Sequence, residues 1–188
     1  MTGLARRLRL RQEDGFTLIE LLMAMIVLSV GILALVAAYS SGYVALNRAT
    51  RVSSATLVAD SQMERLRALT YSNIKLSTTC GAGCSVDATY TGDSAYSAAA
   101  QVTGCPTTTP MDPACLPTQT KTGPDGKSYR LDTYIVYTCI SGTLSTSPSV
   151  TCGSGNPAPL KRVTLVVRSS SLTTPVREQS TFTTFPGS

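Results

Sequence analysis

Gly15-Phe16-Thr17-Leu18-Ile19-Glu20 opens a 23-residue apolar run from Phe16 to Ala38, and this run is the main sequence evidence for the fold. An α-helix of that length spans about 35 Å, which is enough to cross a hydrocarbon layer of about 30 Å. The run holds a single charge, Glu20. A carboxylate costs about 2.5–3.5 kcal/mol near the bilayer centre and less near a helix end. A chain that keeps one there is expected to use it.

The residues before the apolar run are basic, and they predict the orientation of the chain in a membrane. The positive-inside rule places this end in the cytoplasm and everything after Ala38 outside. A cleaved signal peptide is one alternative, but its apolar core is usually only 7–15 residues long. A plain single-pass anchor is another, although it leaves Glu20 unexplained. The basic residues are Arg6, Arg7, Arg9 and Arg11.

Gly15 and Glu20, together at the head of the run, resemble the amino-terminal region of type IV prepilins and of the related pseudopilins of type II secretion systems. The resemblance covers about the first 30 residues closely. It implies that prepilin peptidase removes a leader, Met1–Gly15, and that the new N-terminal residue, Phe16, is N-methylated. Glu20 then acts in assembly. Major pilins often have a helix-breaking proline in this region, whereas the first proline here is Pro106. The chain is in this respect similar to PilV-type minor pilins or the smaller pseudopilins.

Composition argues against catalysis and specific nucleic-acid binding. The 188 residues include no His, so a Ser-His-Asp or Cys-His group cannot be built and the commonest metal ligand is missing. The net charge is +5, of which the leader contributes +2 and the rest +3 without a dense stripe. We therefore expect no enzyme, no cofactor and no resident metal. A calcium site at Asp125 and Asp132 would fall short of the six to eight oxygen ligands that the ion takes.

All six cysteines lie beyond the apolar run, in the part that is expected to be exported. An even count in an oxidising compartment favours disulfides, while a zinc site or free thiols remain alternatives. The number of possible pairings is 15. We predict that sequence neighbours pair, because this closes short loops. The predicted pairs are Cys80 with Cys84, Cys105 with Cys115, and Cys139 with Cys152.

The helix is expected to continue past the membrane as an amphipathic segment, residues 39–71, and so to run from about Phe16 to Leu69. Apolar residues recur there at spacings of three and four, which is one helical stripe. We expect this stripe to lie across a sheet and Glu64 to pair with Arg67. The stripe consists of Leu46, Ala49, Val52, Thr56, Ala59, Met63, Leu66 and Leu69.

The remainder divides into a disulfide-held loop region, residues 72–128, and an antiparallel sheet, residues 129–188. The sequence Pro124-Asp125-Gly126 is a turn signal, and alternating patterns predict strands at 129–140, 160–169 and 176–185. The predicted fold class is α+β. A long N-terminal helix, whose first half spans the membrane, packs on a small antiparallel sheet of about three strands, as in type IV pilins.

The function implied is that of a minor pilin of a type IV pilus, with a pseudopilin of a type II secretion system as the alternative. A membrane-anchored exported binding module or enzyme is a remote third. The expected partners are other pilin or pseudopilin subunits, prepilin peptidase, an inner-membrane assembly platform and the lipid bilayer. The expected location is first the cytoplasmic membrane, with the C-terminal domain outside. After assembly, the expected location is the cell-surface pilus or a periplasmic pseudopilus.

Overall fold

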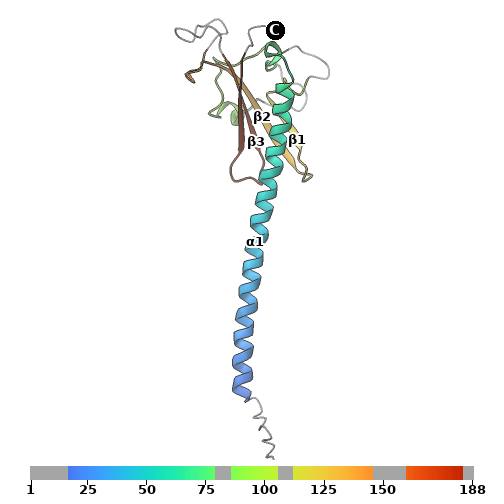
Figure 1. Cartoon of the computed structure of the whole chain (residues 1–188), viewed down its shortest axis with the longest axis vertical. Coiled ribbons are helices and arrows are strands. Elements are labelled where there is room, and N and C mark those ends of the chain that lie inside the picture. Colours follow the sequence, from blue (N-terminus) through green and yellow to red (C-terminus); the bar gives the residue numbers. More distant parts are fainter. Residues whose placement is uncertain (1–16, 79–85, 106–111, 146–159, 184–188) are drawn as a thin grey trace, which may run out of the picture. The chain divides into compact units, whose positions relative to one another are not determined.

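The computed structural model describes residues 17–78, 86–105, 112–145 and 160–183 (Figure 1). The chain forms two compact units, residues 1–46 and 47–188, which are treated separately below. The elements are α1 (Leu18–Arg67), the 3-10 helix η1 (Tyr71–Asn73), α2 (Ala88–Thr91), β1 (Thr118–Thr122), β2 (Ser128–Thr138), β3 (Leu160–Arg168) and β4 (Val176–Phe182).

The described part of the first unit is helical from Leu18 onward. Its side chains are exposed along the whole of residues 17–46. By length and composition, α1 is the one helix among the described residues that is apolar enough to cross a membrane. We predicted a helix from about Phe16 to Leu69, and α1 agrees with this to within two residues at each end.

The second unit is built on one antiparallel sheet with the strand order β1-β2-β3-β4, so each strand pairs with its neighbour in the chain. The β2–β3 register places Thr133 opposite Leu165, and the β3–β4 register places Thr164 opposite Gln179. The last part of α1 packs on this sheet, which confirms the predicted α+β class. The sheet has four strands where we expected about three. The additional strand, β1, lies inside the segment 72–128, for which we predicted a loop region.

The main core lies between residues 55–66 of α1 and one face of the sheet. Alternate strand residues point into it, as the pattern in β2 and β3 predicted, and Leu131, Ile135 and Leu165 are fully buried. The buried helix face differs from the predicted stripe. Ala59, Met63 and Leu66 are buried as expected, and the face continues through Ser54, Ala55, Val58 and Gln62. The first half of the predicted stripe, Leu46, Ala49, Val52 and Thr56, is exposed.

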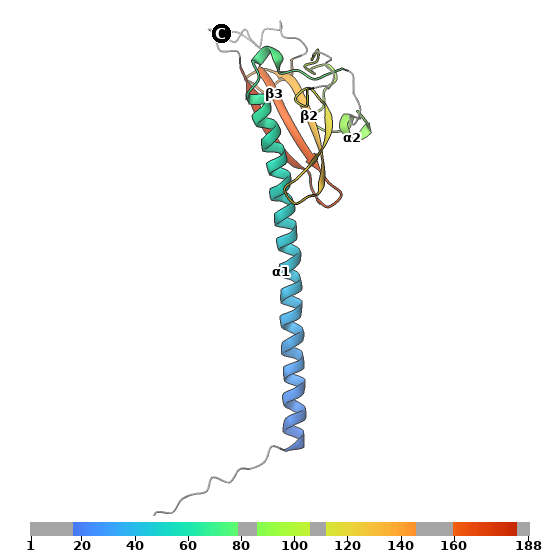
Figure 2. The same ribbon diagram turned by 90° about the vertical axis from the view of Figure 1, so that its right-hand side faces the viewer.

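The opposite face of the sheet is covered as well, by the segment of residues 86–105 that contains α2. Figure 2 shows the end of α1 on one side of β2 and β3, and α2 on the other. Tyr90 of α2 stacks on Tyr134 of β2, with ring centroids 4.4 Å apart, and the two side chains form a second buried cluster with Val166. Both faces of the central strands are therefore buried, which the sequence pattern did not predict.

One of the three predicted disulfides is seen directly. Cys105 is bonded to Cys115, which confirms that pair. Cys139 is also disulfide-bonded, to a partner outside the described residues. The predicted pairs of Cys80 with Cys84 and of Cys139 with Cys152 involve residues outside the described part of the chain.

The predicted turn at Pro124-Asp125-Gly126 connects β1 to β2. Gly126 has a φ of +72°, a conformation that favours glycine. A Cβ added at Gly123 would lie 2.6 Å from the ring of Tyr129, so a side chain there would displace that buried tyrosine. The Asp125 carboxylate accepts hydrogen bonds from the Tyr129 hydroxyl and the Lys127 amide. The turn is thus fixed to the inner face of β2.

Candidate functional site

The candidate site in the first unit is the first turn of α1, which carries Glu20. The predicted cleavage-site residues, Gly15 and Phe16, lie outside the described part of the chain. The Thr17 carbonyl accepts hydrogen bonds from the amides of Glu20, at 3.0 Å, and Leu21, at 3.2 Å. The Thr17 hydroxyl is 3.4 Å from the Glu20 amide. Thr17 therefore occupies the capping position, and Thr17-x-x-Glu20 has the spacing of a capping box.

This geometry places the Glu20 carboxylate at the positive end of the helix. The unpaired amides of a first turn attract an anion, so the position is electrostatically favourable for a carboxylate. Glu20 is exposed, as are the apolar residues beside it; Leu18 is 78% exposed. The carboxylate is thus presented at the surface of the apolar end, available to a group outside the chain.

The rest of the apolar helix offers a continuous surface with no cover from the chain itself. None of the most apolar window of α1 is buried. So large an exposed apolar surface indicates lipid or another protein as its surroundings. Its large members are Leu18, Ile19, Leu21, Leu22, Met23, Met25, Ile26, Val27, Leu28, Val30, Ile32, Leu33, Leu35, Val36, Tyr39, Tyr43, Val44 and Leu46.

Comparison with known proteins identifies this region. Residues 10–36 match the family model described as the prokaryotic N-terminal methylation motif. The chain therefore carries the type IV prepilin or pseudopilin signal at its N-terminus. This signal implies processing by prepilin peptidase, assembly with other pilin-type subunits, and a membrane-anchored N-terminus. Neither a curated protein nor a solved structure matches the chain.

In the second unit, a network of ion pairs joins the outer segment, residues 86–105, to the sheet. Arg130 donates to both carboxylate oxygens of Asp87, at 2.6 and 2.8 Å, and to Asp132 at 2.8 Å. Asp87 also caps α2 by accepting from the Tyr90 amide. The hydrogen bond from Arg130 and that from the Tyr90 amide hold the pKa of Asp87 well below its usual range.

The same network continues across β3 to β4. Arg168 bonds to both Asp132 and Asp93, and Arg177 donates to both oxygens of Asp93, at 2.9 and 2.7 Å. Asp132 is fully buried, and burial raises its pKa against the opposing effect of Arg130. At Asp93 burial acts to raise the pKa, but the hydrogen bonds from Arg177 and the Ala95 amide, together with the charges of Arg177 and Arg168, outweigh it, so the pKa is lowered. The network fixes the position of the outer segment.

Sequence reasoning missed this network, although one signal was present. In β2, Arg130, Asp132 and Tyr134 alternate with residues of the main core, so charged groups share the outer face of this strand. The partners are distant in the chain. Asp87 lies 43 positions before Arg130, in a segment whose sequence has no helical or strand periodicity, and Arg168 lies 36 positions after Asp132. Both carboxylates of the suggested calcium site have partners within the chain, since Asp132 bonds to arginines while Asp125 accepts from Tyr129 and Lys127.

Lys161 is a second unpredicted feature, because its side chain is buried on the inner face of β3. The ammonium donates to the backbone carbonyls of Tyr71, at 2.5 Å, and Ile74, at 2.9 Å, and lies 4.3 Å from the centroid of the Tyr71 ring. It thus joins η1 and the residue that follows it to the sheet. Burial, with repulsion from Lys75, lowers its pKa to about 8.

Proposed function

We propose that this chain is a minor pilin of a type IV pilus, cleaved by prepilin peptidase and assembled into an extracellular filament through its N-terminal helix. The observation that carries the proposal is Glu20, an exposed carboxylate in the first turn of an apolar helix that begins inside the matched motif. In this proposal the chain has no catalytic activity, and the exported unit supplies a surface on the filament.

The proposed role of Glu20 is to set the register between subunits. Cleavage after Gly15 creates an α-amino group at Phe16, whose ordinary pKa is about 7.7–8.0. A buried ammonium and a buried carboxylate are each costly alone and compensate when paired. A slip of one helical turn, about 5.4 Å, would separate the charges. Pairing of Glu20 with the Phe16 amine of a neighbouring subunit therefore penalises every wrong stagger.

The apolar surface of α1 fits both environments that such a subunit meets. Before assembly these side chains face lipid, and afterwards they pack against the helices of other subunits. Lipid tails and a helix bundle are about equally apolar, so the exchange involves little hydrophobic driving force. The free energy of transfer from lipid to filament is then small, so an assembly motor can extract the subunit from the membrane.

Mass spectrometry of the protein from cells tests the processing step. We expect a mature N-terminus at methylated Phe16, and therefore loss of the 15 residues before it. An intact leader, or a cut after Ala38, would remove the basis of the proposal.

A Glu20→Gln variant tests the assembly step. The substitution keeps the size of the side chain but removes the charge that would compensate the buried amine, a loss worth several kcal/mol. We expect normal cleavage and membrane insertion, and a decrease of about tenfold or more in the amount recovered in sheared filaments. Glu64→Gln, which changes an exposed carboxylate in the same helix, is the matched control. Wild-type abundance of the Glu20 variant in filaments would contradict the assigned role.

A pseudopilin of a type II secretion system would share everything described for the first unit. Six cysteines and a long segment rich in Ser, Thr and Gly support a surface-exposed pilus subunit instead. Fractionation distinguishes the two. A minor pilin should be released by shearing the cell surface, whereas a pseudopilin should stay in the periplasmic fraction. Neighbouring genes give a second test, since a retraction motor favours the pilus and an outer-membrane secretin with secretion partners favours the pseudopilus.

A further inference from the structure

We propose that the outer face of the β3–β4 ladder contains a binding site for a small oxyanion, a carboxylate or phosphate group. The site is a pocket of about 260 Å³ in the second unit. The β3–β4 register places Thr164 opposite Gln179 and Val166 opposite Arg177, so both strands contribute side chains to one face. Residues 94 and 95 of the outer segment form the facing wall. The lining residues are Ser94, Ala95, Arg162, Thr164, Arg177, Glu178 and Gln179.

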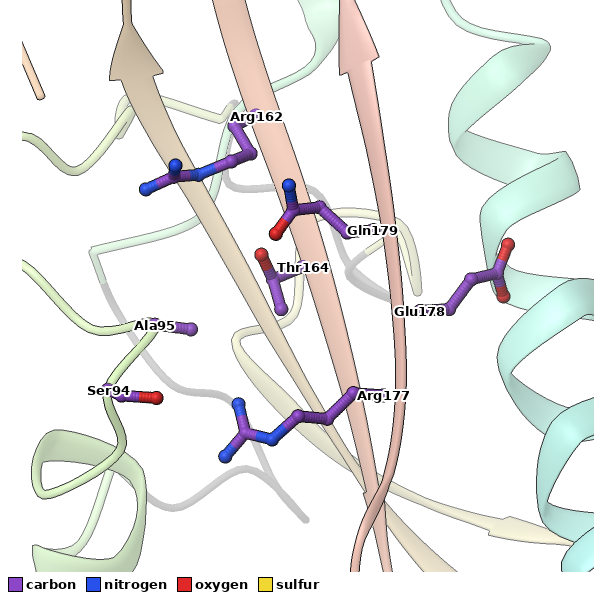
Figure 3. A pocket seen from close by; sticks show the side chains of 7 residues that line it. All are labelled: Ser94, Ala95, Arg162, Thr164, Arg177, Glu178 and Gln179. Carbon is purple, nitrogen blue, oxygen red and sulfur yellow. The ribbon is translucent and has the colours of Figure 1, made fainter. Parts of the chain in front are cut away.

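The side chains are arranged around a common space. Figure 3 shows Arg162 and Arg177 extending from the sheet at the two ends of the pocket, with Thr164 and Gln179 between them. Glu178 lines the pocket, but its carboxylate points the opposite way, toward the helix (Figure 3). The acidic group therefore does not occupy the space that the two guanidinium groups flank.

The outer face of the sheet carries one more arginine than its carboxylates pair with. On this face Asp87, Asp93 and Asp132 are matched by the three arginines that bond to them. Arg162 is a fourth guanidinium, half-buried, and the described residues give it no hydrogen-bond or ion-pair partner. A half-buried unpaired guanidinium is the group that a carboxylate or phosphate matches, because its parallel N–H donors fit two oxygens of the anion.

Neutral donors stand beside this cation. The hydroxyls of Ser94 and Thr164 and the amide of Gln179 make no side-chain hydrogen bonds within the described residues. Thr164 is only 7% exposed, and it lines the pocket. Arg177 is held by its two bonds to Asp93, which fixes that end of the pocket before a ligand arrives. The pocket thus offers a charged donor with hydroxyl and amide groups around it, suited to an oxyanion on a small polar molecule.

Titration of the full-length chain in detergent, followed by amide chemical shifts, tests the proposal. The probes are galacturonate, inorganic phosphate and, as the uncharged match, galactose. We expect one or both anions to shift the amide signals of Ala95 and Gln179 saturably, and galactose to have no such effect. Saturation by galacturonate alone identifies a hydroxylated carboxylate as the ligand, and saturation by phosphate identifies a phosphate group.

Variants locate the binding. Arg162→Gln should weaken anion affinity at least tenfold, and Gln179→Ala, at an exposed strand position, should weaken it by a smaller factor. Arg65→Gln, an exposed arginine on α1 outside the pocket, is the control and should bind as the wild type does. The proposal is overturned if neither anion binds at 20 mM, about the limit expected for a weak single-site ligand. It is overturned equally if Arg162→Gln and Arg65→Gln bind with wild-type affinity.

Discussion

Some charged residues of the second unit are buried at positions where apolar side chains are usual. Lys161 is the clearest case, since it is 2% exposed and its partners among the described residues are two backbone carbonyls and an aromatic ring. It alternates with Val163, Leu165 and Val167, which all point into the main core. The alternation of β3 indicated that the Lys161 side chain lies on the inner face. Its burial there depends on carbonyls that Tyr71 in η1 and Ile74 after it supply.

The pKa of Lys161 predicts how stability changes with pH. The folded pKa of about 8 is below the ordinary 10.5, so the unfolded chain binds more protons between these values. The contribution of Lys161 to the free energy of unfolding should therefore rise as pH increases from 8 to 10.5. Chemical denaturation should show that the difference in the free energy of unfolding between the wild type and Lys161→Met changes over this pH range. Lys127→Met, at an exposed turn, is the control. A difference independent of pH would contradict the prediction.

At the scale of elements, contacts between α1 and the sheet combine matched and mismatched charges. Glu64 and Arg67 form the predicted pair on the helix surface, at 2.5 Å. Glu178 of β4 faces Asp60 of α1, and its Oε2 is buried with no hydrogen-bond partner in the described part of the chain. Two carboxyl groups that face each other can share a hydrogen bond only if one of them is protonated. Arg67 lies 4.0 Å from Glu178 and compensates in part.

A Glu178→Gln substitution should stabilise the second unit at neutral pH. Burial, followed by repulsion from Asp60, raises the pKa of Glu178 above 4.5. The folded state then binds the proton more tightly, so stability is full below pH 4.5 and is lost as pH rises through the folded pKa. The amide cannot ionise and can donate to Asp60. Urea denaturation should show a gain at pH 7 that disappears near pH 4. A loss of stability at pH 7 would refute this account.

At the scale of the whole molecule, the two units depend on different interactions. Residues 17–46 expose apolar side chains throughout, so their stable surroundings must come from lipid or other subunits. The second unit buries both faces of its central strands, and much of its irregular chain is tied to β2. Val102 donates to the carbonyl of Ile135, and Leu76 accepts from the amides of Gly104 and Cys105. The Cys105–Cys115 disulfide closes this arrangement beside β1.

Removal of that disulfide should therefore lower the free energy of unfolding of the second unit. Bonds of this kind typically contribute about 2–4 kcal/mol, toward the lower end for short loops. This one spans a sequence separation of 10. Replacing Cys105 and Cys115 by Ser should lower the urea midpoint accordingly, and reduction of the wild type should lower it at least as far. Equal midpoints for wild type and double variant under oxidising conditions would show that the backbone bonds around Leu76 suffice.

Local patterns determined a large part of this protein from the sequence alone. The apolar run with Glu20, three of the strands, the Pro124-Asp125-Gly126 turn and the pairing of Cys105 with Cys115 all follow from residues close together in the chain. The missed strand, Thr118–Thr122, is short and carries no apolar alternation, although the turn after it required a partner strand. The buried side of α1 was also misplaced near residues 46–56, because small residues such as Ser54 and Ala55 are buried there by the sheet.

The cover on the outer face of the sheet, and the pairing of the charges there, depend on long-range packing. Asp87, Asp93, Asp132 and their arginines are scattered over about 90 positions, and no periodicity connects them. Their pairing depends on the path of residues 86–105 across the strands, a long-range choice made by packing rather than by local preference. The apolar helix is the opposite case. Its length and its one carboxylate are local properties, and they stay the same whatever the rest of the chain does.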